Sequence, residues 1–106
     1  MYRKIKIFKQ DQIIIDGKKK QSDPELYYEA TAKISSLTAR ELYEAMEKKI
    51  ENAIVFELRN CKKVRAIRSQ MKKLFIEYDG QKFDLYYADC KKTDDAWYII
   101  KAHAHS

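Results

Sequence analysis

Alternation of apolar and polar residues is the main pattern along this chain, and it predicts a mainly β protein. Short alternating or apolar runs, each long enough for one strand, occur within residues 4–8, 12–15, 26–34, 54–59, 73–88 and 96–102. Strands of this length separated by polar turns are typical of small antiparallel folds.

The clearest hairpin lies within residues 73–88, where Asp79 and Gly80 fit the positive backbone angles of a two-residue type I′ turn. This turn predicts three cross-strand pairs: Tyr78 with Gln81, Ile76 with Phe83, and Leu74 with Leu85. Strict alternation then points Phe83, Leu85 and Tyr87 inward and Tyr86 outward.

Residues 38–50 interrupt the strands with a well-marked helix. Thr38 and Glu41 have the spacing of a capping box, and Leu37 and Leu42 have that of a hydrophobic staple. The face that we expect to pack against the strands consists of Ala39, Leu42, Tyr43, Met46 and Ile50.

Together these elements predict one domain over residues 1–106. The expected fold is a small antiparallel β-barrel or sandwich of about six strands, with one α-helix (about residues 38–50) packed on it and covering one opening. Residues 16–25, which contain the only proline, form the longest expected loop. Residues 61–71 fit either a connection or a short helical turn, because Val64, Ile67 and Met71 have helical spacing.

The net charge of +6 is concentrated in two places. One is the cluster Lys18, Lys19 and Lys20; the other is the acid-free window 59–73, whose basic residues are Arg59, Lys62, Lys63, Arg65, Arg68, Lys72 and Lys73. Such segments suit either a phosphate backbone or a solvated connection or assembly surface. The second interpretation is favoured, because proteins that bind single strands interleave basic with aromatic residues and this window has no aromatic residue.

Residues that carry catalysis or hold cofactors are sparse. Cys61 and Cys90 lack the spacing of a redox or zinc motif, and we expect free thiols in a reducing compartment. His103 and His105 would share one strand face as a metal pair, but no third ligand lies near them in sequence, which favours an ordinary C-terminal tail. We therefore predict no enzyme, no catalytic or metal-binding residues and no cofactor.

Three segments carry a family resemblance: residues 32–45 (AKISSLTARELYEA), 54–59 (IVFELR) and 71–85 (MKKLFIEYDGQKFDL). This order of a strand, a capped helix with an aromatic residue, a strand with a late Arg and a Gly-turn hairpin resembles the head-tail adaptor family of tailed phages. Its members are also called head closure or head-tail joining proteins. The resemblance spans residues 3–102, and the chain departs from the family pattern at Thr38-Ala39, where Ser-Gly is more usual, and in the highly charged window 61–73.

The resemblance implies a structural virion protein that joins the portal or adaptor complex of the filled head to the tail. It would form a ring that continues the DNA channel and, in some members, closes it. The implied partners are the portal or adaptor ring of the phage head, a tail completion or tail tube protein, phage DNA in the channel, and further copies of the chain. These copies would be monomeric when isolated and form a ring of about twelve subunits on the family pattern.

The expected location is the virion, at the head-tail interface, after synthesis in the cytoplasm of the host bacterium. No membrane is involved, because the chain has neither a membrane-spanning apolar run nor a signal-peptide core.

Two groups of site residues follow. The expected loop offers a partner-facing or channel-facing element comprising Lys18, Lys19, Lys20, Gln21 and Ser22, and the basic window offers an assembly surface comprising Lys62, Lys63, Arg65 and Arg68. The alternative function is a small basic β-barrel that binds nucleic acid directly.

Overall fold

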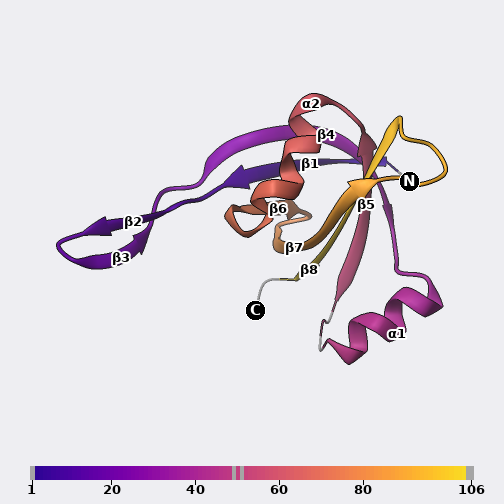
Figure 1. Cartoon of the computed structure of the whole chain (residues 1–106), viewed down its shortest axis with the longest axis horizontal. Helices are drawn as coiled ribbons and strands as arrows, with labels where there is room; N and C mark the ends of the chain where they lie inside the picture. The colour runs from indigo at the N-terminus through magenta and orange to yellow at the C-terminus, as the bar shows by residue number, and fades with distance from the viewer. Residues whose placement is uncertain (1, 49, 51, 105–106) are drawn as a thin grey trace.

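Six antiparallel strands form a closed barrel in the computed structural model, which describes residues 2–48, 50 and 52–104 (Figure 1). Their order around the barrel is β1-β4-β5-β8-β7-β6, and β1 pairs with β6 to close it. The strands are β1 Tyr2–Lys9, β4 Glu25–Ser35, β5 Ala53–Arg59, β6 Leu74–Tyr78, β7 Gln81–Cys90 and β8 Trp97–Ala104. The prediction of a small antiparallel barrel or sandwich is thus confirmed, and the barrel is the alternative that forms.

Alternate residues of these strands fill the barrel. Ile5, Ile7, Ile76 and Ile100 are almost completely buried, as their period-two spacing requires. Phe56 and Phe83 meet edge to face with ring centroids 6.0 Å apart, a favoured geometry for buried aromatic rings. The aliphatic and aromatic residues of all six strands therefore share one core.

The hairpin of β6 and β7 forms as predicted. Asp79 and Gly80 have φ angles of 53° and 74°, as a type I′ turn requires. Tyr78 pairs with Gln81, and Ile76 with Phe83, which confirms the predicted register.

A bulge in β7 overturns the prediction for Tyr87. The register with β8 shifts between Leu85 and Tyr87, so Tyr86 is an extra residue and Tyr87 pairs with Lys101 on the outer surface. Tyr86 and Tyr87 both lie outside the barrel, and alternation resumes with the buried Ala88.

A short helical segment, rather than the predicted helix, covers the barrel core between β5 and β6. It comprises α2 (Lys62–Arg65) and the 3₁₀ helix η1 (Ala66–Lys73), which confirms the helical alternative for residues 61–71. Val64 and Ile67 are completely buried in the core from this segment. Its exposed positions are mostly basic: Lys62, Lys63, Arg65, Arg68, Lys72 and Lys73.

Helix α1 (Ala39–Glu47) begins at Thr38 with the predicted capping box, but its orientation differs from the prediction. Its apolar residues Leu42, Tyr43 and Met46 are 51%, 69% and 66% exposed, and it lies beside the barrel rather than over an opening (Figure 1). The reason is that the strands beside it present Lys101, Tyr86 and Tyr87, and the polar edge of the helix packs against these three side chains.

Residues 12–21 form a two-stranded hairpin outside the barrel, which we call the arm. It consists of β2 (Gln12–Ile15) and β3 (Lys18–Gln21), so the prediction of a loop over residues 16–25 was wrong. Asp16 and Gly17 have φ angles of 52° and 76°, forming the same kind of turn as Asp79-Gly80. The arm projects toward one end of the long axis, away from α1 (Figure 1).

Gly80→Val should lower the free energy of unfolding by about 1 to 2 kcal/mol, because a β-branched residue is strained at positive φ. A new Cβ at Gly80 would meet nothing within 4 Å, so the cost is confined to the backbone. Denaturant melts would measure it against Asp79→Asn, which tolerates positive φ.

Gly17→Val is the matched control, because it strains the same backbone geometry in the arm, where none of residues 12–21 is buried. We expect the global melt of this variant to match the wild type. Equal losses for Gly80→Val and Asp79→Asn would contradict the assigned turn.

Candidate functional site

Two apolar surfaces, one basic surface and one further group of aromatic rings with a lysine lie outside the barrel core and are candidates for function. The first apolar surface belongs to the arm. Ile13 pairs with Lys20 and Ile15 with Lys18, and paired residues share one side of a ribbon. We call this set, Ile13, Ile15, Lys18 and Lys20, the isoleucine-lysine face.

The opposite side of the arm carries Ile14, which is 74% exposed and pairs with Lys19. The arm therefore has an apolar residue on both sides, but two isoleucines on only one of them. Lys18, Lys19, Lys20 and Gln21, predicted as loop residues, all belong to strand β3.

Hydrogen bonds join the two chain segments at the root of the arm, and Lys73 links that root to η1: the amide of Gln10 donates to the Lys73 carbonyl at 2.8 Å. The amide of Ser22 donates to the carbonyl of Asp11 at 2.7 Å, and the amide of Asp11 donates to Oγ of Ser22 at 3.0 Å. Gln10 donates from Nε2 to the carbonyl of Ser22 at 2.8 Å, and Lys73 approaches the Asp11 carboxylate at 3.4 Å. Ser22, predicted as a partner-facing residue, thus stabilises the base of the arm.

The second apolar surface is the outward face of α1, formed by Leu42, Tyr43 and Met46. A surface helix usually turns such a face toward the core. In this chain Ala45 is instead the buried residue of the helix, and the largest apolar side chains face solvent.

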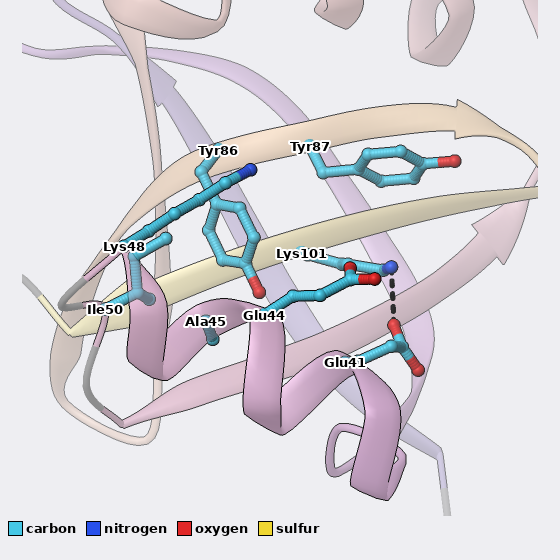
Figure 2. Close-up of a pocket in the computed structure, with 8 residues that line it drawn as sticks. All are labelled: Glu41, Glu44, Ala45, Lys48, Ile50, Tyr86, Tyr87 and Lys101. Carbon is cyan, nitrogen blue, oxygen red and sulfur yellow. Dashed lines mark ion pairs between the residues drawn. The ribbon is translucent and has the colours of Figure 1, made fainter.

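An ion pair holds the inner edge of α1 against the barrel (Figure 2). Lys101 Nζ lies 2.5 Å from a Glu41 carboxylate oxygen, and the same ammonium lies 4.5 Å from the centre of the Tyr87 ring. Glu41 also accepts a hydrogen bond from the amide of Thr38 at 3.2 Å. Glu41 therefore takes part in the capping box and also attaches the helix to the barrel.

Burial alone would raise the pKa of Glu41, but the hydrogen bonds from Lys101 and Thr38 outweigh burial and lower it below its ordinary value. Burial, and then the nearby Glu41 charge, raise the pKa of Tyr86, so its hydroxyl stays protonated at neutral pH. The hollow between these groups has a volume of about 160 Å³. Cavities that bind small molecules have volumes of about 300 to 1,000 Å³, and an adjoining hollow of about 340 Å³, lined in part by Glu41, Tyr87 and Lys101, reaches the lower end of that range.

The basic surface comprises Lys62, Lys63, Arg65 and Arg68, which the structure brings together as exposed residues of α2 and η1. It is anchored through Tyr27, whose hydroxyl donates to the Lys63 carbonyl at 2.7 Å. The Lys63 ammonium lies 4.8 Å from the centre of the Tyr27 ring. The structure thus supplies an aromatic partner that the basic window itself lacks.

A second basic and aromatic group lies on the outer surface of β1, β6 and β7. Phe8 and Phe75 stack with ring centroids 5.4 Å apart, and Lys82 lies 4.3 Å from the centre of the Phe75 ring. Sequence analysis missed this group, because its members come from three strands.

The cysteines and histidines do not converge within the described part of the chain. Both thiols are free; Cys61 lies 3.7 Å from the Tyr28 hydroxyl, and Cys90 accepts a hydrogen bond from Asn60. His103 belongs to β8, beside Tyr86, whereas His105 lies outside the described residues. Among residues 2–48, 50 and 52–104, no three His, Cys, Asp or Glu side chains form a group that could hold a metal ion.

Comparison with known proteins adds no relative: no family model matches the chain, and a search of curated proteins returned no match. None of the helices in the described residues is long and apolar enough to cross a membrane.

Lys101→Met should raise the pKa of Glu41, because it removes the ammonium that stabilises the carboxylate while keeping an aliphatic chain over Tyr87. An NMR titration of the Glu41 carboxyl group would measure the shift. Arg40→Gln is the control, since Arg40 pairs with Glu44 rather than Glu41.

The lowered pKa also fixes the pH dependence of stability. The contribution of the Glu41 carboxylate is present above the pKa that Glu has in the unfolded chain and is lost as pH falls through the folded-state pKa. The stability difference between wild type and Lys101→Met should therefore shrink in acid. An unchanged Glu41 titration in Lys101→Met would contradict the assigned ion pair.

Proposed function

We propose that this protein is a structural virion protein of a tailed phage that joins the portal or adaptor ring of the filled head to the tail. The observation that carries the proposal is that two apolar surfaces, on the arm and on α1, remain outside the core. Apolar patches of this kind mark surfaces that meet other proteins. The resemblance of residues 3–102 to head-tail adaptors is our ground for proposing the head-tail junction as the assembly in which these surfaces take part.

A ring subunit needs two unlike surfaces, because a heterologous contact closes into a ring when its rotation permits. The arm and α1 are two such surfaces and lie toward opposite ends of the molecule (Figure 1). The barrel between them provides a rigid spacer, and the longest dimension of the molecule is 48 Å. A ring built from these subunits would continue the DNA channel between head and tail.

The basic residues have two roles in this proposal. The lysines of the arm face a protein partner or the channel, and Lys62, Lys63, Arg65 and Arg68 form a surface for assembly or for passing DNA. A positive surface attracts the phosphate backbone without reading its sequence, which suits a channel through which all of the genome passes.

Removing the arm tests the proposal. Residues 12–21 can be replaced by Asn-Gly, because the bonded pair of Asp11 and Ser22 already brings the two chain ends together. We expect the free energy of unfolding to change by less than about 0.5 kcal/mol, since no arm residue is buried. Purified wild type mixed with portal-bearing, tail-less capsids should add a ring visible by electron microscopy, and the armless variant should not.

The control replaces Lys18, Lys19 and Lys20 by Gln, which keeps the arm and removes its charge. Loss of the ring in this control would assign the partner contact to charge rather than to the isoleucines. Failure of the wild type to add a ring would overturn the head-tail proposal.

Direct nucleic-acid binding is the second candidate function, and the stacked Phe8-Phe75 pair beside Lys82 is the observation that favours it. Aromatic rings next to lysines are the platform that single-strand binders use, and both phenylalanine rings of this pair are half-buried. The basic surface on α2 and η1 would follow the phosphate backbone.

This alternative predicts that the purified monomer binds DNA oligonucleotides with a steep salt dependence. Replacing Lys62 and Arg65 by Gln should then reduce the slope of log affinity against log salt by about two. The matched control is Lys18→Gln with Lys20→Gln on the distant arm. Tight, salt-dependent binding together with no ring on capsids would replace the head-tail proposal with this one.

A further inference from the structure

We propose that the outer edge of β2 pairs with the same edge of β2 in a second copy of this chain, so that two arms form one four-stranded antiparallel sheet. The strand order of this sheet is β3-β2-β2-β3, with the β2 strands of the two copies in the middle. The inference goes beyond the proposed function, because it gives the arm a partner in the purified protein, without portal, tail or DNA.

The outer edge of β2 carries main-chain groups that no strand of the described residues pairs with, since β2 and β3 form a sheet of only two strands. In a ribbon closed by a two-residue turn, the residues next to the turn exchange two hydrogen bonds, and every second pair repeats this pattern. The 2.7 Å bond from the Ser22 amide to the Asp11 carbonyl fits this phase, because that pair lies four residues from the pair of Ile15 and Lys18. The amide and carbonyl of Ile14 therefore point away from β3.

The two edges of the arm differ in composition. β2 reads Gln-Ile-Ile-Ile, whereas β3 reads Lys-Lys-Lys-Gln. All of these residues are exposed. Lysines on an edge strand are a common protection against pairing with another strand. The edge of β2 has no such protection, so it is the edge of the arm that is suited to receive a strand.

Charge decides which edges of two copies meet. Pairing β3 with β3 would place the lysines of both copies on neighbouring strands, about 4.8 Å apart. Pairing β2 with β2 puts the lysine strands on the outside of the sheet, three strand spacings or about 14 Å apart, which exceeds the Debye length of about 8 Å at physiological ionic strength. Pairing β2 with β3 of the next copy would place a lysine strand at every second position and could repeat without limit.

The isoleucines fix the register of the two β2 strands. An antiparallel pairing centred on Ile14 joins this residue to Ile14 of the second copy by two reciprocal hydrogen bonds. The same register sets Ile13 of each copy opposite Ile15 of the other, so every isoleucine has an isoleucine across from it. Centring the pairing on Ile13 would instead set Ile15 opposite the charged Asp11. Asp16, the only acid among residues 12–21, lies opposite Gln12 in the favoured register.

The contact closes on two copies. The arm projects away from the barrel, so antiparallel arms leave the two barrels at opposite ends of the shared sheet (Figure 1). The edges that remain free are the two β3 strands, whose lysines discourage further pairing. The contact is also small, and interfaces below about 1,200 Å² are typical of weak association. We therefore expect the purified chain to be monomeric at about 10 µM and dimeric, but nothing larger, toward about 1 mM.

Two proline variants on opposite edges of the arm test the contact. Ile14→Pro places the proline ring on the outer edge of β2 and removes an amide that makes no bond to β3, so the arm keeps its own hydrogen bonds. Lys19→Pro is the matched control, because Lys19 pairs with Ile14 and its amide points to the outer edge of β3. Sedimentation equilibrium should find Ile14→Pro monomeric at concentrations at which the wild type and Lys19→Pro are dimeric.

Three results would overturn the pairing. One is a wild type that stays monomeric at about 1 mM or continues to larger oligomers. The second is dimerisation of Ile14→Pro to the same extent as the wild type. The third is loss of the dimer in Lys19→Pro when its NMR spectrum still shows the cross-strand contacts of the arm.

Cysteine crosslinking tests the register without changing the backbone. In a chain that carries Cys61→Ala and Cys90→Ala, Ile14→Cys should form a disulfide-linked dimer in a glutathione redox buffer, because the two Cα atoms would lie about 5.5 Å apart. Lys19→Cys is the control and should crosslink far less, because the two β3 strands are about 14 Å apart. Equal crosslinking of the two variants, or crosslinking of Lys19→Cys alone, would refute pairing through β2. These assays use purified protein alone, so their failure is distinguishable from failure to add a ring to capsids, which would refute the head-tail function instead.

Discussion

The pairing of β1 with β6 is the constraint on which the rest of the structure depends. Ile7 lies opposite Ile76 in this pairing, and the hydrogen bonds between the strands close the sheet into a barrel. A closed barrel of this size has one interior, which side chains from its own strands fill. Val64 and Ile67 complete that core from the segment between β5 and β6. Apolar residues elsewhere in the chain must therefore lie outside, which is why the arm and α1 expose theirs.

Closure also explains the composition of the arm. The six barrel strands leave no free edge among themselves, but a two-stranded ribbon has two edges that could pair with any other strand. Consecutive lysines on β3 discourage pairing of two arms along that edge, because their charges repel. An isolated hairpin is only marginally stable, and the hydrogen bonds of Ser22 and Gln10 hold its two chain segments together at the root, which Lys73 contacts. The arm can thus expose isoleucines without offering a general site for aggregation.

The barrel strands, the type I′ turn at Asp79-Gly80 and the capping box at Thr38 were predictable from the sequence, because each depends on residues close together in the chain. Closure of the sheet depends on the long-range pairing of β1 with β6, and the sequence therefore left a barrel and a sandwich both open. The arm was also signalled, since Asp16-Gly17 repeats that turn dipeptide. Three successive lysines have low strand propensity and obscured the signal. The bulge at Tyr86 could not be predicted, because two successive tyrosines hide the shift that one inserted residue makes in an alternating pattern.

The candidate surfaces were predictable only as lists of residues. Leu42, Tyr43 and Met46 of the predicted apolar face belong to α1, whereas Ile50 lies beyond its end at Glu47. Periodicity cannot say whether such a face turns toward the core or away from it. Its direction depends on Lys101 and Tyr87, which lie far from α1 in the chain and meet it only in the folded barrel. The basic residues of the window 59–73 were likewise evident, whereas their anchoring by Tyr27 needs the long-range contact with β4.

The attachment of α1 has a further consequence for assembly. A helix held by one ion pair and its capping interactions gains little from burial, because Ala45 is its only buried residue among positions 39–47. A partner that covers Leu42, Tyr43 and Met46 would supply the apolar burial that the barrel does not. Anything that binds the folded form alone stabilises that form, so covering this face would strengthen the docking of α1 as assembly proceeds. In the isolated chain the helix keeps its apolar face available, and in the assembly the same face contributes to stability.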